Sequence, residues 1–433
     1  MYKFADDGTV KVTAPDTPTC INSMETVISS IQSWTKKWRM KVNCNRNKTE
    51  YICFNTAEDN KDLIPKSYQV GENEIYLVDR TKVLGLTIDE DLTYIPHSSD
   101  ILNSLNEKWA NICMYSNRHW GFNLKVMSCL IKALFLSKLS YASHIWTSKE
   151  NMKEINSLFY KMIKAVTGAV FNISQIVAEV ILGIPPLHIQ VQISSIKHFL
   201  KMNIKPIAND RYQEFISNVC KEIQNSPPLV LKKFKEIFHF LQWKVYNHPA
   251  QFSLADVVIV ENRQYDQFFT LSSKSCTYSK EMINKYIEVL WSAALRNQFQ
   301  LEGHATSPKP SCSVIPIPQN TSREAEVKLM SLLYKNNLLN SSLYKLGRTP
   351  SPMCSGCGRV EETAKHILFE CSTVDDSLRR AALSEYNRLN VNTPELSHDD
   401  TFIGLLNAIK DSKFVCVSLR ILEDFPIRTS IEL

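Results

Sequence analysis

Four residues near the C-terminal end of the chain have the types and spacing of metal ligands. Cys354, Cys357, His366 and Cys371 form a Cys-x2-Cys-x8-His-x4-Cys series. Zn²⁺ takes four tetrahedral thiolate or imidazole ligands, and two cysteines separated by two residues commonly supply half of such a site. His366 and Cys371 are five positions apart, so about one turn of a following helix could bring both to one ion. We therefore predict that these residues bind Zn²⁺.

The same residues also have a plainer interpretation. Cysteine is among the most frequently buried residue types, and a single core histidine is more often hydrogen-bonded than metal-bound. Four such residues at ligand spacing favour the metal site over four unrelated core positions. Three thiolates and one imidazole fill a tetrahedral site and leave no position for water or substrate. We therefore expect the zinc to be structural and not catalytic.

A second set of reactive residues lies at the opposite end, in the series Phe4-Ala5-Asp6-Asp7-Gly8. Residues 2–5 and 8–12 are short β-prone arms, so the sequence predicts a hairpin with Asp6 and Asp7 at its turn. Asp-Asp-Gly is also a common turn sequence, because Asp bonds to its own backbone and Gly tolerates positive φ. On these residues alone, the carboxylates are more typical of an ordinary turn than of a catalytic site.

The segment that follows this hairpin predicts a small α+β unit. Apolar residues repeat at three and four positions from Thr19 to Trp38, which indicates an amphipathic helix. Short β-prone segments come next, at residues 40–42, 50–54, 75–78 and 82–88. We assign residues 1–95 to this unit.

From Ser98 onward the pattern is helical and basic. One apolar stripe is predicted at Val126, Leu130, Leu134, Ser137, Tyr141 and Ile145. At 100° per residue this places Lys125 and Lys132 on the opposite face. Residues 96–205 contain 12 Lys and Arg against 5 Asp and Glu, a surplus of 7 that exceeds the +6 of the whole chain. Such a segment is typical of a surface that contacts phosphates, and a solvated helix face is the alternative.

The remaining elements complete an α+β fold that is predominantly helical. Further helices are expected at residues 152–166, 187–202, 279–300, 324–336 and 401–422. Residues 206–323 are assigned to a helical connector that ends in a Pro-rich linker, and residues 324–433 to a zinc module with a helical tail. A chain of 433 residues is long enough for several such domains.

The other cysteines and the apolar segments bear on the compartment. Outside the cluster the cysteines are isolated along the chain, which suits a reducing environment. The first residues lack the apolar segment of a secretory signal, and the most apolar stretch, residues 124–146, carries three lysines. We expect an intracellular protein, nuclear or cytoplasmic, that is not secreted and has no membrane partner.

Several motifs, taken in order, resemble the reverse transcriptases of non-LTR retrotransposons of the LINE, jockey-like kind. The similar segments are Phe4–Asp7, Trp34-x3-Trp38, Lys48-Thr49-Glu50, Lys82–Asp89, Leu139-Ser140-Tyr141 with Trp146, Thr167-Gly168, and Leu343–Arg348 before the Cys/His series. The resemblance implies an RNA-directed DNA polymerase, with a palm at residues 1–95, a thumb at residues 96–205 and a C-terminal zinc knuckle. Its partners would be the RNA and DNA of a template and primer.

The resemblance also implies catalytic roles for Asp6, Asp7 and Lys48. Nucleotidyl transfer uses two Mg²⁺ ions about 4 Å apart, and these hard ions need carboxylate oxygens on a rigid support. The family's pattern places Asp6 and Asp7 at the metals and Lys48 near the leaving pyrophosphate, although Lys48 is equally typical of a solvated loop. Mg²⁺ is thus expected as a cofactor only if the chain is catalytic.

The chain also departs from this family's pattern. The family carries a fingers region and a further metal-binding Asp on an earlier palm strand, and only three residues precede Phe4 here. We therefore expect a fragment that does not polymerise DNA by itself. Two other classes of function stay open: a non-catalytic zinc protein that binds nucleic acid, with Lys125 and Lys132 as candidate contacts, and a domesticated relic with structural interactions only.

Overall fold

The computed structural model divides into two compact units, residues 1–101 and 102–433, and each is described by itself. The structure describes residues 2–4, 7–45, 48–54, 62–169, 171, 173–204, 257–260, 268–271, 280–302, 304, 306–334, 337–390, 398–423 and 425–427. Over these residues it is mostly helical, with short strands that pair as two-stranded antiparallel sheets. The predicted α+β, predominantly helical class is therefore confirmed.

The first unit combines one long helix with hairpins. Its elements are β1 (Tyr2–Phe4), β2 (Asp7–Thr9), α1 (Thr17–Lys37), β3 (Ser67–Val70), β4 (Asn73–Tyr76), β5 (Arg80–Val83) and β6 (Leu86–Asp89). The Asp16 carboxylate accepts a hydrogen bond from the Thr19 backbone N–H at 2.8 Å, which caps α1 two residues before its predicted start at Thr19. Ile28 of α1 packs with Tyr51, Tyr68 and Ile75 in the core of this unit.

The N-terminal hairpin is present, with a register different from the predicted one. Phe4 pairs with Asp7, and Tyr2 pairs with Thr9. Asp7 therefore lies on β2 and not at the turn, and Ala5 and Asp6 are outside the described residues. The register fixes the backbone of Asp7 opposite that of Phe4.

The strand predicted at residues 82–88 is wrong, because this segment forms a hairpin. Leu84 has φ 48° and Gly85 has φ 83°, and Val83 pairs with Leu86 across them. Two successive positive φ values define the two-residue turn that matches the twist of an antiparallel pair, and Gly85 adopts its value without steric cost. The side chain of Leu84 is consequently exposed at the tip.

The other predicted strands were only partly correct. Residues 75–78 correspond to β4, but its partner β3 was not predicted. Residues 40–42 and 50–54 form no strand, and Tyr51 makes a single parallel bridge to Leu77. Short apolar runs become strands only where a neighbouring segment satisfies their backbone groups, and that pairing is not encoded locally.

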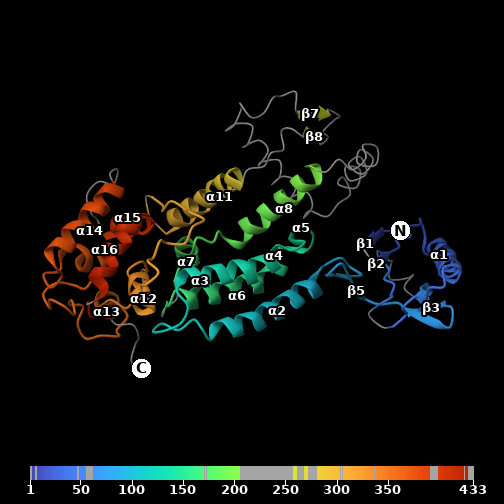
Figure 1. Cartoon of the computed structure of the whole chain (residues 1–433), viewed down its shortest axis with the longest axis horizontal. Coiled ribbons are helices and arrows are strands. Elements are labelled where there is room, and N and C mark those ends of the chain that lie inside the picture. The colour runs from blue at the N-terminus through green and yellow to red at the C-terminus, as the bar shows by residue number, and fades with distance from the viewer. Residues whose placement is uncertain are drawn as a thin grey trace. The chain divides into compact units, whose positions relative to one another are not determined.

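The second unit is helical (Figure 1), and the division between the units falls within the residue range of α2. Its elements are α2 (Ile95–Cys113), α3 (Leu124–Leu130), a π-helical stretch (Ile131–Leu136), α4 (Ser137–Ser140), α5 (Ser143–Trp146), α6 (Asn151–Val166), α7 (Gln175–Leu182), α8 (Leu187–Ile204), β7 (Val257–Val260), β8 (Phe268–Leu271), α11 (Lys280–Leu301), α12 (Arg323–Ser331), α13 (Asn340–Lys345), a π-helical turn (His366–Glu370), α14 (Asp376–Leu389), α15 (His398–Ala408) and α16 (Ser412–Glu423). The helix predicted at residues 401–422 is in fact two, α15 and α16, and α14 was not predicted.

The apolar stripe predicted along residues 126–145 is wrong. Val126, Tyr141 and Ile145 are 39%, 53% and 39% exposed, and the core instead holds Met127, Ile131, Phe135 and Leu139, with Trp146. Both series have helical spacing in a segment that is apolar on most sides, so periodicity alone did not choose between them. The series with the larger apolar side chains is the buried one.

Among the described helices, none is long and apolar enough to cross a membrane singly. One bent pair, Gln175–Leu182 with Leu187–Ser195, passes that test jointly, with 58° between its two parts.

Candidate metal centre and nucleic-acid interface

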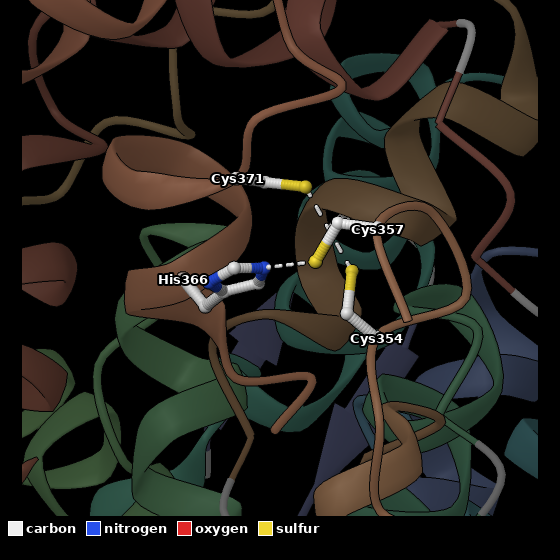
Figure 2. A group of neighbouring side chains, drawn as sticks. All are labelled: Cys354, Cys357, His366 and Cys371. Carbon is white, nitrogen blue, oxygen red and sulfur yellow. Dashed lines mark hydrogen bonds between the residues drawn. The ribbon is translucent and has the colours of Figure 1, made fainter. Parts of the chain in front are cut away.

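The four predicted ligands converge in the second unit (Figure 2). One ligand atom from each of Cys354, Cys357, His366 and Cys371 lies within 4.8 Å of the others. The Cys354 and Cys371 sulfurs are 3.8 Å apart, and the Cys357 sulfur is 3.3 Å from His366 Nε2. Cys354, His366 and Cys371 are buried, and Cys357 is half-buried. This Cys3His group could hold a metal ion.

The spacing between the ligand atoms agrees with tetrahedral zinc. A Zn–S bond of about 2.3 Å and a Zn–N bond of about 2.0 Å imply tetrahedron edges of about 3.8 Å between sulfurs and about 3.5 Å between sulfur and nitrogen. The observed separations of 3.8 Å and 3.3 Å are close to both values. The residues therefore fit Zn²⁺ in donor type and in distance.

The first two ligands lie on a closed loop. The Cys354 backbone N–H donates to the Val360 carbonyl at 2.8 Å, and the Gly358 N–H donates to the Cys354 carbonyl at 2.8 Å. Gly358 has φ +64° with open space around it, so glycine relieves the strain of the left-handed turn that follows Cys357. The loop thus turns both sulfurs toward the same side.

His366 and Cys371 are brought together by a π-helical turn. In an α-helix, residues five apart point about 140° away from each other, which would separate these two ligands. Here the Cys371 N–H donates to the His366 carbonyl at 2.7 Å, the i to i+5 hydrogen bond of a π-helix. The wider turn aligns the two side chains, and this explains how a His-x4-Cys spacing serves one ion.

The pKa values of two thiols in the cluster are shifted in opposite directions. Burial raises the pKa of the Cys354 thiol. The backbone N–H of Arg359 and the imidazole of His366 lower the pKa of the Cys357 thiol. His366 Nδ1 is buried without a hydrogen-bond partner, and the Glu370 carboxylate lies 3.9 Å from it. A carboxylate behind a ligating histidine is a common way to orient the ring toward a metal.

Glu362 positions the cysteine loop, a role that the sequence analysis did not assign to it. Its carboxylate is 1% exposed and accepts hydrogen bonds from the backbone N–H of Ser355, at 2.6 Å, and of Asn340, at 2.9 Å. Ser355 lies between the first two cysteines, and Asn340 begins α13. Glu362 therefore fixes the cysteine loop against α13, and its spacing from the ligands does not by itself predict that contact.

The predicted catalytic residues receive little structural support. Asp6 is outside the described residues, and the Asp7 side chain is not described. Lys48 is exposed in a turn, with its N–H bonded to the Asn45 carbonyl. Asp89, another acidic residue of the first unit, uses both carboxylate oxygens to accept hydrogen bonds from Thr93 and Tyr94. Burial opposes ionisation of Asp89, but these hydrogen bonds outweigh it and hold its pKa below the ordinary value.

The two predicted nucleic-acid contacts differ in environment. Lys125 is exposed on α3. Lys132 is half-buried, and its Nζ donates to the Cys312 carbonyl at 3.3 Å. Burial lowers the pKa of the Lys132 ammonium. Lys125 is therefore available to a phosphate, whereas Lys132 also holds the extended segment around Cys312.

A buried ion pair on α12 joins three parts of the helical region. Arg323 Nη1 lies 2.9 Å from Glu326 Oε2, with the side chains 3% and 1% exposed. Arg323 donates to the carbonyls of Asn117, at 3.1 Å, and Val166. Glu326 accepts from the Leu124 N–H at 3.1 Å, at the start of α3. The pair fixes the loop before α3 and the end of α6 to α12.

The comparisons with known proteins define a class: the chain is similar to RNA-directed DNA polymerases of non-LTR retrotransposons, and the predicted resemblance is confirmed. In Drosophila melanogaster, the polymerase of the mobile element jockey is 20% identical over 205 residues, which are 47% of this chain and 22% of that protein. The probable polymerases of the X-element and of transposon BS are 22% identical over 170 residues and 23% identical over 172, each 39% of this chain and 18% of the relative.

The matched part of this chain thus spans about a fifth of the length of these relatives. No family model matches the chain, and no solved structure does.

Proposed function

We propose that the chain is the C-terminal part of an RNA-directed DNA polymerase of a non-LTR retrotransposon. The observation that carries this proposal is its similarity over 205 residues to the jockey polymerase. Residues 1–95 would then contain part of the palm and residues 96–205 the thumb, and RNA and DNA would be bound as template and primer. Residence in the nucleus or cytoplasm follows from such substrates.

The Cys3His group is proposed as a structural zinc site of this polymerase. Its four ligand atoms and their separations leave no position for a substrate. When bound, Zn²⁺ would supply a fixed point that joins the cysteine loop to the π-helical turn. Glu362 would hold the cysteine loop and Glu370 the His366 ring in place before the ion arrives, which lowers the cost of ordering the ligands.

Catalysis is assigned to Asp6 and Asp7, with Lys48 as a candidate for the pyrophosphate. These residues would bind Mg²⁺, but two adjacent carboxylates cannot alone hold two octahedral ions at the separation that in-line transfer requires. The hydrogen bonds to Asp89 make it a poor further ligand. We therefore propose that a polypeptide of only these 433 residues is inactive.

Primer extension tests this assignment. With Mg²⁺, the 433-residue polypeptide should not detectably extend oligo(dT) on poly(A), because the metal ligands are too few. A fusion that places the fingers and remaining palm of a jockey-type polymerase before residue 1 should extend the primer, and Asp6→Ala should abolish that activity. Robust extension by the 433 residues alone, or an active Asp6→Ala fusion, would contradict the roles proposed here.

A second prediction concerns nucleic-acid binding, which a non-catalytic zinc protein would share. The logarithm of the association constant for duplex DNA should fall linearly with the logarithm of the salt concentration, because phosphate binding releases counterions. Lys125→Glu should weaken binding and flatten that slope by up to about 0.9. Lys345→Glu, an exposed lysine outside residues 96–205, is the control and should leave the slope unchanged. Fluorescence anisotropy at several salt concentrations measures the affinity and its salt dependence for each protein. A parent protein whose affinity does not change with salt would refute binding through phosphates.

A further inference from the structure

The loop between α2 and α3 exposes an unusual concentration of large apolar side chains. Met114, Tyr115, Trp120 and Phe122 are 62%, 47%, 58% and 41% exposed. Single exposed apolar residues are ordinary on a protein surface. Four within nine consecutive positions form a patch, and such patches commonly mark an interaction site.

This aromatic loop, residues 114–122, is well ordered by its own contacts. The Phe122 N–H donates to the Tyr115 carbonyl at 3.0 Å, and Ser116 forms an antiparallel bridge with Gly121. The rings of Tyr115 and Phe122 are stacked, with centroids 5.1 Å apart and 27° between their planes. The exposure of these rings is therefore a property of a formed hairpin.

Side chains of α12 also hold the aromatic loop in place. Arg323 donates to the Asn117 carbonyl inside the loop, and Glu326 accepts from the N–H of Leu124, just after it. Both charged side chains are buried. A buried ion pair stabilises a fold only when its hydrogen bonds are well satisfied, and here those bonds fix the loop. A rigid aromatic surface loses little conformational entropy when it binds a partner.

The charge of the segment that contains the loop indicates the kind of partner. Residues 109–149 contain no Asp or Glu, and they include five cations, Arg118, Lys125, Lys132, Lys138 and Lys149. A basic segment without carboxylates that carries exposed rings complements a polyanion that also has flat apolar faces. Unpaired nucleotides have both properties, since aromatic side chains stack on bases while Lys and Arg contact phosphates.

We propose that the aromatic loop is a platform on which unpaired bases of RNA or single-stranded DNA stack, with Trp120 as its principal ring. This inference rests on the proposed function, because it names the form of nucleic acid that the basic region takes. Duplex DNA keeps its base faces inside the helix and gains only the phosphate contacts. The loop therefore favours single strands over duplexes.

Binding of three labelled probes tests the platform: oligo(U) of 20 nucleotides, oligo(dT) of the same length and a blunt duplex of 20 base pairs. Trp120→Ala should weaken binding of both single strands about 10-fold, within the range measured for loss of one stacking ring. Its affinity for the duplex should stay within about twofold of the parent value, since phosphate contacts remain. Trp120→Phe should retain most of the affinity, because a ring is still present. A difference between the oligo(U) and oligo(dT) arms identifies which strand the platform prefers.

Tyr344→Ala is the matched control, because Tyr344 is 50% exposed and lies outside the loop. Its affinities should equal those of the parent protein. Equal affinity of Trp120→Ala and the parent for single strands would overturn the platform and leave the proposed function standing, provided that the parent binds with the expected salt dependence. An equal loss of affinity of Trp120→Ala for the duplex and for the single strands would also overturn the platform. A dimer in sedimentation that Trp120→Ala converts to a monomer would assign the loop to a protein contact instead. Absence of all nucleic-acid binding by the parent would refute the proposed function itself.

Discussion

Replacing Cys371 with serine will release the proposed zinc ion and locally unfold the region around it. Cys371 is fully buried, and its sulfur lies 3.8 Å from that of Cys354. A serine hydroxyl does not replace a thiolate in a structural zinc site, and three remaining ligands bind the ion far more weakly. Zinc binding to such sites is worth about 10–16 kcal/mol at neutral pH and acts as local folding free energy. The expected loss of local folding free energy is therefore large.

Metal content and hydrogen exchange measure this outcome. The parent protein should carry one zinc per chain, and Cys371→Ser should carry almost none. Amides of residues 352–390 should exchange faster in the variant, while those of β3 and β4 in the first unit should be unchanged. Cys416→Ser is the matched control, because Cys416 is a half-buried free cysteine on α16 outside the cluster. Parent protein purified without any bound metal, or full zinc retention by Cys371→Ser, would contradict the proposal.

The ligand set was predictable because its members lie within 18 residues of one another. Cys354, Cys357, His366 and Cys371 are local in sequence, and ligand chemistry restricts what such a group can do. The π-helical turn that aligns His366 with Cys371 was not predictable, since α-helix geometry is the default for a helical pattern. Local spacing thus identified the residues but not the backbone that joins them.

Long-range packing accounts for the errors in the helical region. Met127 and Val126 each begin an apolar series at helical spacing, and only contacts with other helices bury the series that starts at Met127. Lys132 was predicted on a solvated face, but the segment at Cys312, distant in sequence, covers part of it. Glu362 was missed for the same reason, because its partner Asn340 is in another element. Periodicity describes one helix, and burial depends on its neighbours.

The pair Arg323 and Glu326 gives the clearest case of a feature that depends on the complete fold. Their spacing of three suggests a surface ion pair on a helix, which is usually worth well under 1 kcal/mol. In the structure both are buried, and Arg323 reaches the carbonyls of Asn117 and Val166, some 206 and 157 residues away in sequence. Because the pair is buried, losing either partner leaves an uncompensated charge and is far more costly than losing a surface pair.

Arg323→Met is expected to lower the free energy of unfolding of the second unit by about 3–5 kcal/mol, the usual cost of leaving one partner of a buried pair uncompensated. Methionine fills much of the volume, so the loss comes from the Glu326 charge and from the freed carbonyls of Asn117 and Val166. Burial already raises the pKa of Glu326 even with Arg323 present, and removing the guanidinium will raise that pKa further. Urea denaturation of the parent and the variant measures the difference.

Adding Glu326→Gln to Arg323→Met should recover at least about 1 kcal/mol, because glutamine removes the uncompensated charge yet still accepts the hydrogen bond from the Leu124 N–H. The control is Arg380→Met, since Arg380 pairs with Asp376 at the surface with its side chain 76% exposed, and its loss should cost under about 1 kcal/mol. If Arg323→Met costs no more than Arg380→Met, the pair on α12 does not hold the loop before α3. If the double variant is less stable than Arg323→Met, the destabilisation does not arise from the buried charge of Glu326.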